Sequence, residues 1–354
     1  MTEKIKVGII GCGGIARATH IPNYKKISDV EIVACADVNI EAAKKTAEEF
    51  NIAKYYKDYN EMLEKENLDA VSVCTPNVLH KDPAIAAMKH GAHVLTEKPM
   101  AGSLKDAKEM YEASKKYNKI LIVGYQTRFR VDIIALKTLV ESGELGEIYY
   151  SEALHLRRWG IPVSPTFLNK SLSGGGPLLD IGCYAVDSAM YVLGFPKPKS
   201  VLGVTYNKFG KNPEMAKKGG WGGAWKPEEF QVEDNAFAFI KFENGMSMLL
   251  ETNWASFIKE DGLNLVLLGT KGGAQLKPLE LYKEIMGSRV TITPQDKIPE
   301  VDIYNQRIAK FVESVKSGKA LFSPAIEGLK VQAILDAIYN SAEKGKEVPV
   351  EWDF

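Results

Sequence analysis

Short apolar runs alternate with longer amphipathic segments along the first third of the chain. Lys6–Ile10 and Glu31–Ala36 are nearly continuous in apolar residues, which predicts parallel strands buried on both faces. Glu41–Phe50 instead has apolar residues at helical spacing and charged residues on its outer face. Further strands are expected at Ala70–Cys74, His93–Thr96 and Ile120–Gly124, and helices from about Gly13, at Pro83–His90 and at Ser103–Tyr117. This alternation predicts βαβ units, and therefore an α/β domain over residues 1–124 with a doubly wound parallel sheet.

The pattern changes after Gly124 to strands with alternating polar and apolar residues. An amphipathic helix at Arg130–Ser142 precedes them, and Asn244–Gly245 between two alternating runs predicts a type I′ hairpin turn. The expected strands are Glu147–His155, Pro198–Tyr206, Ala236–Phe242, Met246–Trp254, Leu263–Leu268 and Gly273–Leu276. Residues 125–354 are therefore expected to form an α+β domain with a large, mostly antiparallel sheet. Two C-terminal helices, about Asp302–Ser317 and Ile326–Glu343, are expected to pack back towards the first domain.

Length and composition agree with two ordinary globular domains. The chain has 354 residues, of which 45% are hydrophobic and 25% charged, with 45 basic and 45 acidic side chains. This balance argues against nucleic-acid or membrane-surface binding, and no apolar run approaches the roughly 18–20 residues needed to span a bilayer. The four cysteines (Cys12, Cys35, Cys74, Cys183) stand singly and are expected to be buried thiols. The histidines form no ligand pair, so we expect no metal site. Met1–Lys6 runs directly into a strand without the basic and apolar regions of a signal peptide, so we expect a cytoplasmic protein.

The first expected strand ends in a glycine motif, Gly11–Cys12–Gly13–Gly14–Ile15–Ala16. Its GxGxxA spacing follows a strand and opens a helix, which is the context of a dinucleotide-binding Rossmann turn. Gly11 permits the tight turn, Gly13 lets a pyrophosphate approach the backbone, and Ala16 allows close helix–strand packing. The helix start offers unpaired N–H groups to phosphates, so Gly14 and Ile15 belong to the same predicted site.

Asp37 lies 21 residues beyond Ala16, at the end of the second expected strand. A carboxylate there bonds the adenosine ribose hydroxyls and repels a 2′-phosphate, which favours NAD over NADP. The alternative is a helix N-cap or a solvated turn residue.

Three later motifs resemble the glucose-fructose oxidoreductase/inositol dehydrogenase (Gfo/Idh/MocA) family. They are Cys74–Thr75–Pro76–Asn77 followed by His80, Gly91–Pro99 ending in Glu97–Lys98–Pro99, and Gly174–Gly182 with Asp180. Val232–Asp234 and the Asn244–Gly245 hairpin are also similar, so the resemblance covers nearly the whole chain. It implies a cis Lys98–Pro99 bond, an open second sheet whose outer face makes subunit contacts, and a homodimer or homotetramer.

Lys98 is the first catalytic candidate. It ends a strand of the parallel sheet, where α/β sheets place ligands, and its cation would stabilise developing alkoxide charge. Without the surrounding motif a surface lysine would be the natural interpretation. The resemblance implies that Thr75, Pro76, Asn77, His80 and Glu97 line the cofactor near the nicotinamide, although His80 also suits a helix cap.

Asp180 and Tyr184 are the other catalytic candidates. Together with Asp187 and Tyr191 they form one stripe on an otherwise apolar helix that begins near Pro177 and stops at Gly194. Most relatives carry histidine where this chain has Tyr184, and tyrosine resembles the glucose-fructose oxidoreductase, xylose dehydrogenase and dihydrodiol dehydrogenase branches. A tyrosine with an ordinary pKa of about 10 exchanges protons near neutrality only beside a cation, for which Lys98 is the expected partner. The alternative is that Tyr184 is a packed aromatic side chain with no catalytic role.

Weaker candidates follow expected strands. Arg128, after the fifth strand, is placed to contact substrate or Glu97, or to form an interdomain ion pair. Arg157, Arg158 and Trp159 follow a later strand and are candidate substrate contacts. The glycine-rich stretch Gly219–Trp225 carries Trp221 and Trp225, which suit sugar rings, although a mobile loop at a subunit contact is an equal interpretation.

These features predict an NAD(P)-dependent oxidoreductase. Its expected substrate is a secondary alcohol or hemiacetal of a sugar or cyclic polyol, with Lys98, Tyr184 and Asp180 as the catalytic group. One alternative is a glycosidase that oxidises its substrate transiently with NAD. The other is a non-catalytic dinucleotide-binding sensor, against which the retained Lys98 argues.

Overall fold

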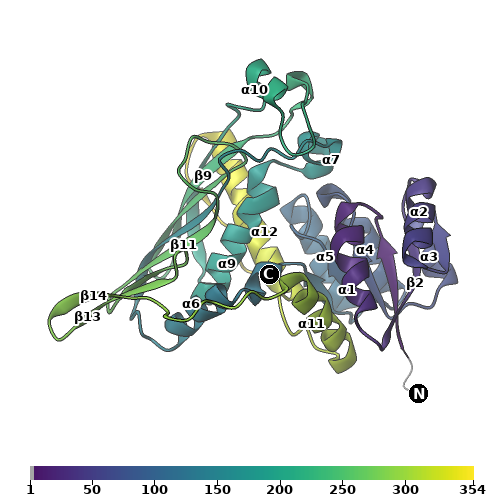
Figure 1. The fold of residues 1–354 in the computed structure, drawn as a ribbon, viewed down its shortest axis with the longest axis horizontal. Helices are drawn as coiled ribbons and strands as arrows, with labels where there is room; N and C mark the ends of the chain where they lie inside the picture. Colours follow the sequence, from purple (N-terminus) through teal and green to yellow (C-terminus); the bar gives the residue numbers. More distant parts are fainter. Residues whose placement is uncertain (1–3) are drawn as a thin grey trace. The chain divides into compact units, whose positions relative to one another are not determined.

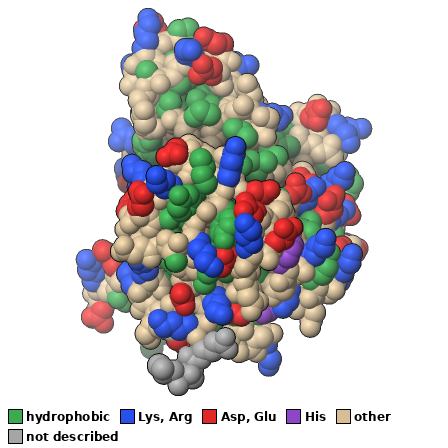
Figure 2. Space-filling view, turned by 90° about the vertical axis from the view of Figure 1, so that its right-hand side faces the viewer, with side chains coloured by type: hydrophobic (Ala, Val, Ile, Leu, Met, Phe, Trp, Pro, Cys, Tyr) green, Lys and Arg blue, Asp and Glu red, His purple; other side chains and the backbone are tan. Residues whose placement is uncertain are grey.

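The computed structural model describes residues 4–354 and contains two compact units. Unit 1 comprises the chain up to Gln126 together with Asp302–Leu329, and unit 2 comprises Thr127–Val301 together with Lys330–Phe354. Each unit has its own sheet. Acidic and basic side chains are interspersed over the face seen in Figure 2, as the equal numbers of the two predict.

Unit 1 is built on a six-stranded sheet in which every neighbouring pair is parallel, in the order β3-β2-β1-β4-β5-β6. This confirms the predicted doubly wound sheet, because the chain moves outwards from β1 in one direction and then in the other. The strands are β1 (Ile5–Ile10), β2 (Val30–Ala36), β3 (Lys54–Tyr56), β4 (Ala70–Val73), β5 (His93–Thr96) and β6 (Leu121–Val123). The carboxyl ends of β1 and β4 are neighbours, so the turns that follow them meet at one edge of the sheet.

Helices connect the strands of unit 1 (Figure 1). They are α1 (Ile21–Lys25), α2 (Ile40–Phe50), α3 (Tyr59–Lys65), α4 (Lys81–Lys89), α5 (Leu104–Lys116) and, from the distant C-terminal segment, α11 (Ile303–Ser317). Capping residues set the helix starts: the side chain of Asn39 accepts from two backbone N–H groups of α2, and Asp302 accepts from Asn305 in α11. Helix α3 was not predicted. The edge strand β3 was not predicted either, because Lys54–Tyr56 is short and largely exposed.

Unit 2 contains a nine-stranded sheet in the order β14-β13-β12-β11-β7-β10-β9-β8-β15. Strands β7 and β10 are parallel and the other pairs are antiparallel, which confirms the predicted mostly antiparallel sheet. The predicted strands are found as β7 (Ile148–Leu156), β8 (Pro198–Tyr206), β9 (Asn235–Phe242), β10 (Ser247–Asn253), β11 (Gly262–Gly269) and β12 (Gly273–Gln275). The unpredicted ones are β13 (Glu280–Ile285), β14 (Ser288–Ile292) and β15 (Val348–Pro349), which lie at the sheet's ends.

One face of this sheet is covered by helices. Helix α9 (Cys183–Leu193) packs on β7, β10 and β11, and α6 (Val131–Glu141) packs on α9 (Figure 1). Helix α12 (Ala325–Lys344) approaches β8 so closely that a Cβ on Gly203 would lie 2.7 Å from the carbonyl oxygen of Ile338. The neighbouring β8 residues Leu202, Val204 and Tyr206 alternate with the buried positions and remain exposed.

One predicted turn type is wrong, and one predicted helix has an unexpected first turn. The hairpin between β9 and β10 forms, but its turn is not type I′, because only Gly245, and not Asn244, has a positive φ. The bond from Gly245 N to the Phe242 carbonyl makes a type I turn closed by a left-handed glycine, which also matches strand twist. The helix near Pro177 begins as a π-helical turn over Leu178–Gly182 before α9, and short helices α7 (Pro165–Leu168), α8 (Lys170–Ser173) and α10 (Pro213–Lys218) were not foreseen.

Candidate active site

The glycine turn follows β1 and packs against the end of β4. Gly11 has φ +92°, and a Cβ there would lie 2.7 Å from the Cys74 carbonyl carbon and 2.9 Å from the Thr75 nitrogen. No other residue fits this close approach of two backbones. Gly13 and Gly14 are exposed, and a Cβ on either would meet nothing within 4 Å. The helix begins at Gly14, so its first N–H groups lie beside open space, as a bound pyrophosphate requires.

Asp37 is held beside this turn at the end of β2. Its Oδ2 accepts a hydrogen bond of 2.8 Å from the backbone N–H of Cys12, and its Oδ1 accepts one of 2.9 Å from that of Asn39. The two bonds fix the carboxylate, while each oxygen keeps acceptor capacity. The arrangement fits ribose hydroxyls next to the glycine turn.

His80 connects two backbone turns of unit 1. It is fully buried, with Nδ1 2.9 Å from the Pro99 carbonyl and Nε2 3.0 Å from the Thr75 carbonyl. Burial lowers the pKa of His80 although both carbonyls oppose this, and the neutral ring donates to one carbonyl at a time. His80 thereby holds the Thr75–Pro76–Asn77 turn against the loop after β5, and its direct contact with a cofactor stays a prediction.

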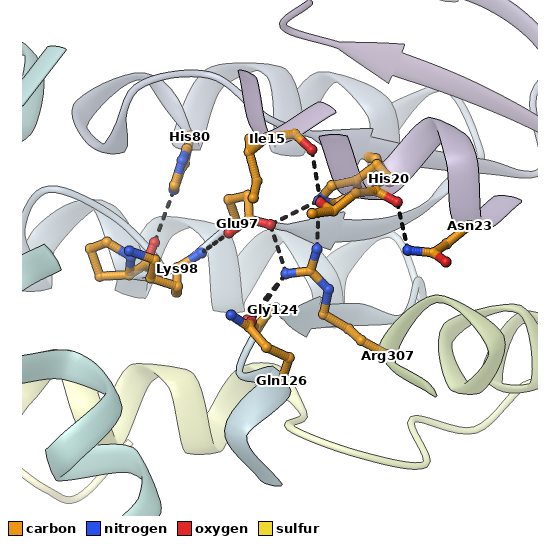
Figure 3. A network of polar contacts seen from close by, with 12 residues as sticks. Ile15, His20, Asn23, His80, Glu97, Lys98, Gly124, Gln126 and Arg307 are labelled. Carbon is orange, nitrogen blue, oxygen red and sulfur yellow. Dashed lines mark hydrogen bonds and ion pairs between the residues drawn. The ribbon is translucent and has the colours of Figure 1, made fainter. Parts of the chain in front are cut away.

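Glu97 and Lys98 follow β5, and the Lys98–Pro99 peptide is cis, as the resemblance implied. The Glu97 side chain turns inward, where its Oε1 lies 2.7 Å from Arg307 Nη1 and 2.8 Å from His20 Nε2 (Figure 3). Its Oε2 accepts from the backbone N–H of Lys98 at 3.3 Å. Burial alone would raise the pKa of Glu97, but Arg307 and His20 outweigh it and hold this pKa well below the usual range. Glu97 is therefore a buried, charged carboxylate that directly precedes Lys98 and bonds its backbone N–H.

Arg307 is a residue that the sequence reasoning missed. It comes from α11 and is fully buried, with Nη1 also donating to Gln126 Oε1 at 3.2 Å (Figure 3). Its Nη2 lies 2.9 Å from His20 Nε2, the ring nitrogen that also contacts Glu97 Oε1. Burial, followed by the charge of Arg307, lowers the pKa of His20. An arginine beside the buried Ile308 and Phe311 of an amphipathic helix was the available signal.

Asp180 is the centre of a polar cluster in unit 2. It is buried in the π-helical turn before α9, and Oδ2 accepts 2.9 Å from Trp254 Nε1 and 3.5 Å from Arg157 Nη1. Arg157 also donates to the Gly160 carbonyl at 3.0 Å. Sequence reasoning named Arg157 and Arg158 together, and the structure separates them: Arg158 is exposed and bonds Asp261 through its backbone. Both arginines lie in the irregular segment directly after β7.

Tyr184 lies one turn after Asp180 and is nearly buried, with its ring 6.2 Å from that of His155. Burial lowers the pKa of Arg157, whereas the charges of Asp180, Asp261 and Tyr184 raise it. The charge of Arg157 therefore interacts with Tyr184 within unit 2. The sequence argument required such a cation and looked for it only in Lys98, which belongs to unit 1.

The remaining candidate residues contact other residues of unit 2. Arg128 forms a buried ion pair with Asp187, in which Nε donates to Oδ2 at 3.0 Å, and its guanidinium lies over the Tyr191 ring. Trp159 donates from Nε1 to the Gly219 carbonyl at 2.7 Å and packs edge-on against Phe209. A substrate contact by any of these residues stays a prediction.

Within residues 4–354, no three histidine, cysteine or carboxylate side chains are grouped as a metal would need. All four cysteines are buried free thiols. No helix of the described part of the chain is long and apolar enough to cross a membrane.

Comparison with known proteins relates both units to one family. Residues 5–125 match the model described as oxidoreductase family, NAD-binding Rossmann fold, and residues 133–275 match that of the GFO/IDH/MocA C-terminal domain. The chain is 37% identical to D-glucoside 3-dehydrogenase of Escherichia coli over 98% of each protein. It is 26% identical to scyllo-inositol 2-dehydrogenase (NAD(+)) of Bacillus subtilis, covering 100% of this chain and 98% of that protein.

Solved structures show the same fold. The crystal structure of aldose-aldose oxidoreductase from Caulobacter crescentus complexed with glycerol matches with a TM-score of 0.80 and 25% identity, over 98% of this chain and 100% of that one. Levoglucosan dehydrogenase in complex with NADH matches with a TM-score of 0.83 and 24% identity, over 99% and 100% of the two chains.

Proposed function

Because the chain belongs to the Gfo/Idh/MocA family of NAD-binding oxidoreductases, we propose that it oxidises a ring hydroxyl of a glucoside. The chain is an NAD(P)-dependent oxidoreductase acting on CH–OH groups of sugars or polyols, and the proposal adds the glucoside as its substrate. The glucoside is supported by the 37% identity to D-glucoside 3-dehydrogenase along almost the full length of both proteins.

The catalytic roles follow from charge and proton capacity. Tyr184 accepts the hydroxyl proton of the substrate, and Arg157 nearby favours the phenolate that this requires. Asp180 orients the sugar, with its own orientation fixed by Trp254 and Arg157. Lys98 stabilises the negative charge that develops on the substrate oxygen. NAD, when bound, accepts the hydride.

The residues of unit 1 fit such a cofactor. Gly13 and Gly14 offer open backbone beside a helix start, and Asp37 presents a fixed carboxylate next to it. The fixed negative charge favours NAD over NADP, because the 2′-phosphate of NADP would lie against it. Asn77 and the Glu97–Lys98 segment complete the cofactor contacts in this proposal.

The proposed assembly is a homodimer or homotetramer formed through the outer face of the unit 2 sheet. Exposed apolar residues on β8 and β9 support it: Leu202, Val204, Tyr206 and Phe239. The four free thiols support a reducing, cytoplasmic location.

Replacement of Lys98 by methionine tests the function. We expect Lys98→Met to lose turnover of methyl glucoside by about 10²- to 10³-fold with its NAD dissociation constant nearly unchanged, because charge stabilisation by one group contributes about this much. Lys89→Met, which removes an exposed lysine from the same unit, is the control and should behave like the wild type. Undiminished turnover of Lys98→Met would reject its catalytic role. Aryl glucoside cleavage without net NADH formation would instead favour transient oxidation by a glycosidase.

A further inference from the structure

The aromatic ring of Trp221 contacts Arg157 of the Asp180 cluster and is partly exposed to solvent. The residue is 57% exposed, and the guanidinium of Arg157 lies 4.3 Å from the centroid of its ring. The same guanidinium donates to Asp180, so one side chain links the exposed indole to the carboxylate that we assign to substrate orientation. Trp225 of the same loop is instead 7% exposed and packs on Phe230, so only Trp221 of the two tryptophans presents its ring to solvent.

The backbone around Trp221 is fixed by hydrogen bonds. Its N–H donates to the Ile161 carbonyl and its carbonyl accepts from Val163 N, both at 2.8 Å. Trp159 secures the start of the loop by donating to the Gly219 carbonyl at 2.7 Å. These bonds tie the Gly219–Trp225 stretch to the core of unit 2, so the indole has a defined position.

The glycines around Trp221 are required by this position. A Cβ on Gly220 would lie 2.2 Å from the Ile161 carbonyl oxygen, and Gly222 has φ +110° with the Val163 carbonyl oxygen 2.9 Å from its Cβ position. A Cβ on Gly160 would lie 2.7 Å from Arg157 Cδ and 3.0 Å from Trp221 Cζ2. Three glycines thus let the loop approach close enough for Arg157 to lie against the indole.

We propose that Trp221 is a binding subsite for a ring attached to the reacting sugar, and so selects glycosides that carry an aryl group or a second sugar. This inference rests on the proposed function and names its substrate class. Arg157 occupies one face of the indole and fixes its distance from Asp180. The exposed part of the ring is available to the C–H face of a pyranose or to an aryl ring.

Steady-state kinetics with methyl glucoside, phenyl glucoside and cellobiose test the subsite. We expect Trp221→Ala to raise KM for phenyl glucoside and cellobiose by roughly 3- to 10-fold with kcat preserved, while KM for methyl glucoside changes less than about twofold. Trp221→Phe keeps an aromatic face and should retain most of the preference. Phe257→Ala is the control, because it removes an aromatic that is 92% exposed in the same unit and packs on Phe209. A rise shared equally by all three substrates, or none, would overturn the proposal.

Calorimetry separates this proposal from the proposed function. Phenyl glucoside and glucose are titrated into wild-type protein and Trp221→Ala in the presence of NADH, which cannot accept a hydride, and near-UV circular dichroism verifies the fold of each. We expect the wild type to prefer phenyl glucoside and the variant to lose that preference, whatever the turnover. Equal preference in both proteins contradicts the subsite, whereas absence of NADH formation by the wild type contradicts only the proposed reaction.

Discussion

Removal of Arg307 should destabilise unit 1 strongly. Arg307 is fully buried and its Nη1 lies 2.7 Å from the nearly buried Glu97 carboxylate. Substitution by methionine fills a similar volume but leaves that carboxylate without its cation and removes the bond to Gln126. Breaking a buried ion pair from one side costs about 3–5 kcal/mol, so we expect a loss of this size in the free energy of unfolding of unit 1.

The probe must report on unit 1 alone. All five tryptophans (Trp159, Trp221, Trp225, Trp254, Trp352) lie in unit 2, so tryptophan fluorescence follows unit 2 during urea unfolding. Hydrogen exchange of the β4 and β5 amides measures the opening free energy of unit 1. We expect Arg307→Met to lower it by about 3–5 kcal/mol and to leave the fluorescence midpoint nearly unchanged.

Two further variants make the test specific. Lys310→Met removes a cation from the same helix that pairs with Glu313 at the surface, and should cost less than about 0.5 kcal/mol. Adding Glu97→Gln to Arg307→Met should recover part of the lost free energy of unfolding, because the double variant no longer buries an unpaired Glu97 carboxylate. A loss below about 1 kcal/mol for Arg307→Met, or no coupling with Glu97→Gln, would refute the account of this network.

The other predictions concern the cofactor, acid stability and proton transfer. Asp37→Ser should weaken NAD binding by about tenfold and raise the NADP to NAD preference. Asp58→Ser, which makes the same exchange at the N-cap of α3, should change neither, and an unchanged preference in Asp37→Ser would assign Asp37 to the turn alone. Burial lowers the pKa of both His20 and His80 below the usual 6.5, so these rings take up protons on unfolding, and their contribution to stability is present above pH 6.5 and lost below it. As pH falls below 6.5, the free energy of unfolding of unit 1 should decrease by up to about 1.4 kcal/mol per pH unit for each ring. His80→Gln should reduce this dependence, which hydrogen exchange measured between pH 7.5 and pH 5 will show. Tyr184→Phe should depress turnover and shift the basic limb of its pH profile, whereas a wild-type profile would make Tyr184 a packing residue.

Sequence patterns predicted the parts of the fold that depend on local apolar spacing. Runs such as Lys6–Ile10 became β1, and the Gly11–Ala16 motif led into a helix as expected. Strand β3 was missed because its three residues carry no buried run. The π-helical turn at Leu178–Gly182 was missed because a helical pattern does not reveal one extra residue in a turn.

The candidate site was predictable where its residues belong to motifs. Arg307 lies 210 positions from Glu97, and no local pattern connects the two. Arg157 and Arg158 are neighbours of identical type in the irregular segment after β7, so no sequence pattern distinguishes the one that reaches Asp180. Long-range pairing and side-chain direction are therefore what the structure adds to the motifs.

The most direct test of the central claim is the reaction of wild-type protein with NAD and methyl glucoside, followed by NADH absorbance and by product analysis. We predict that each NADH formed is matched by one keto-glucoside with its glycosidic bond intact. Failure of methyl glucoside, free sugars and cyclic polyols alike to reduce NAD would contradict the claim.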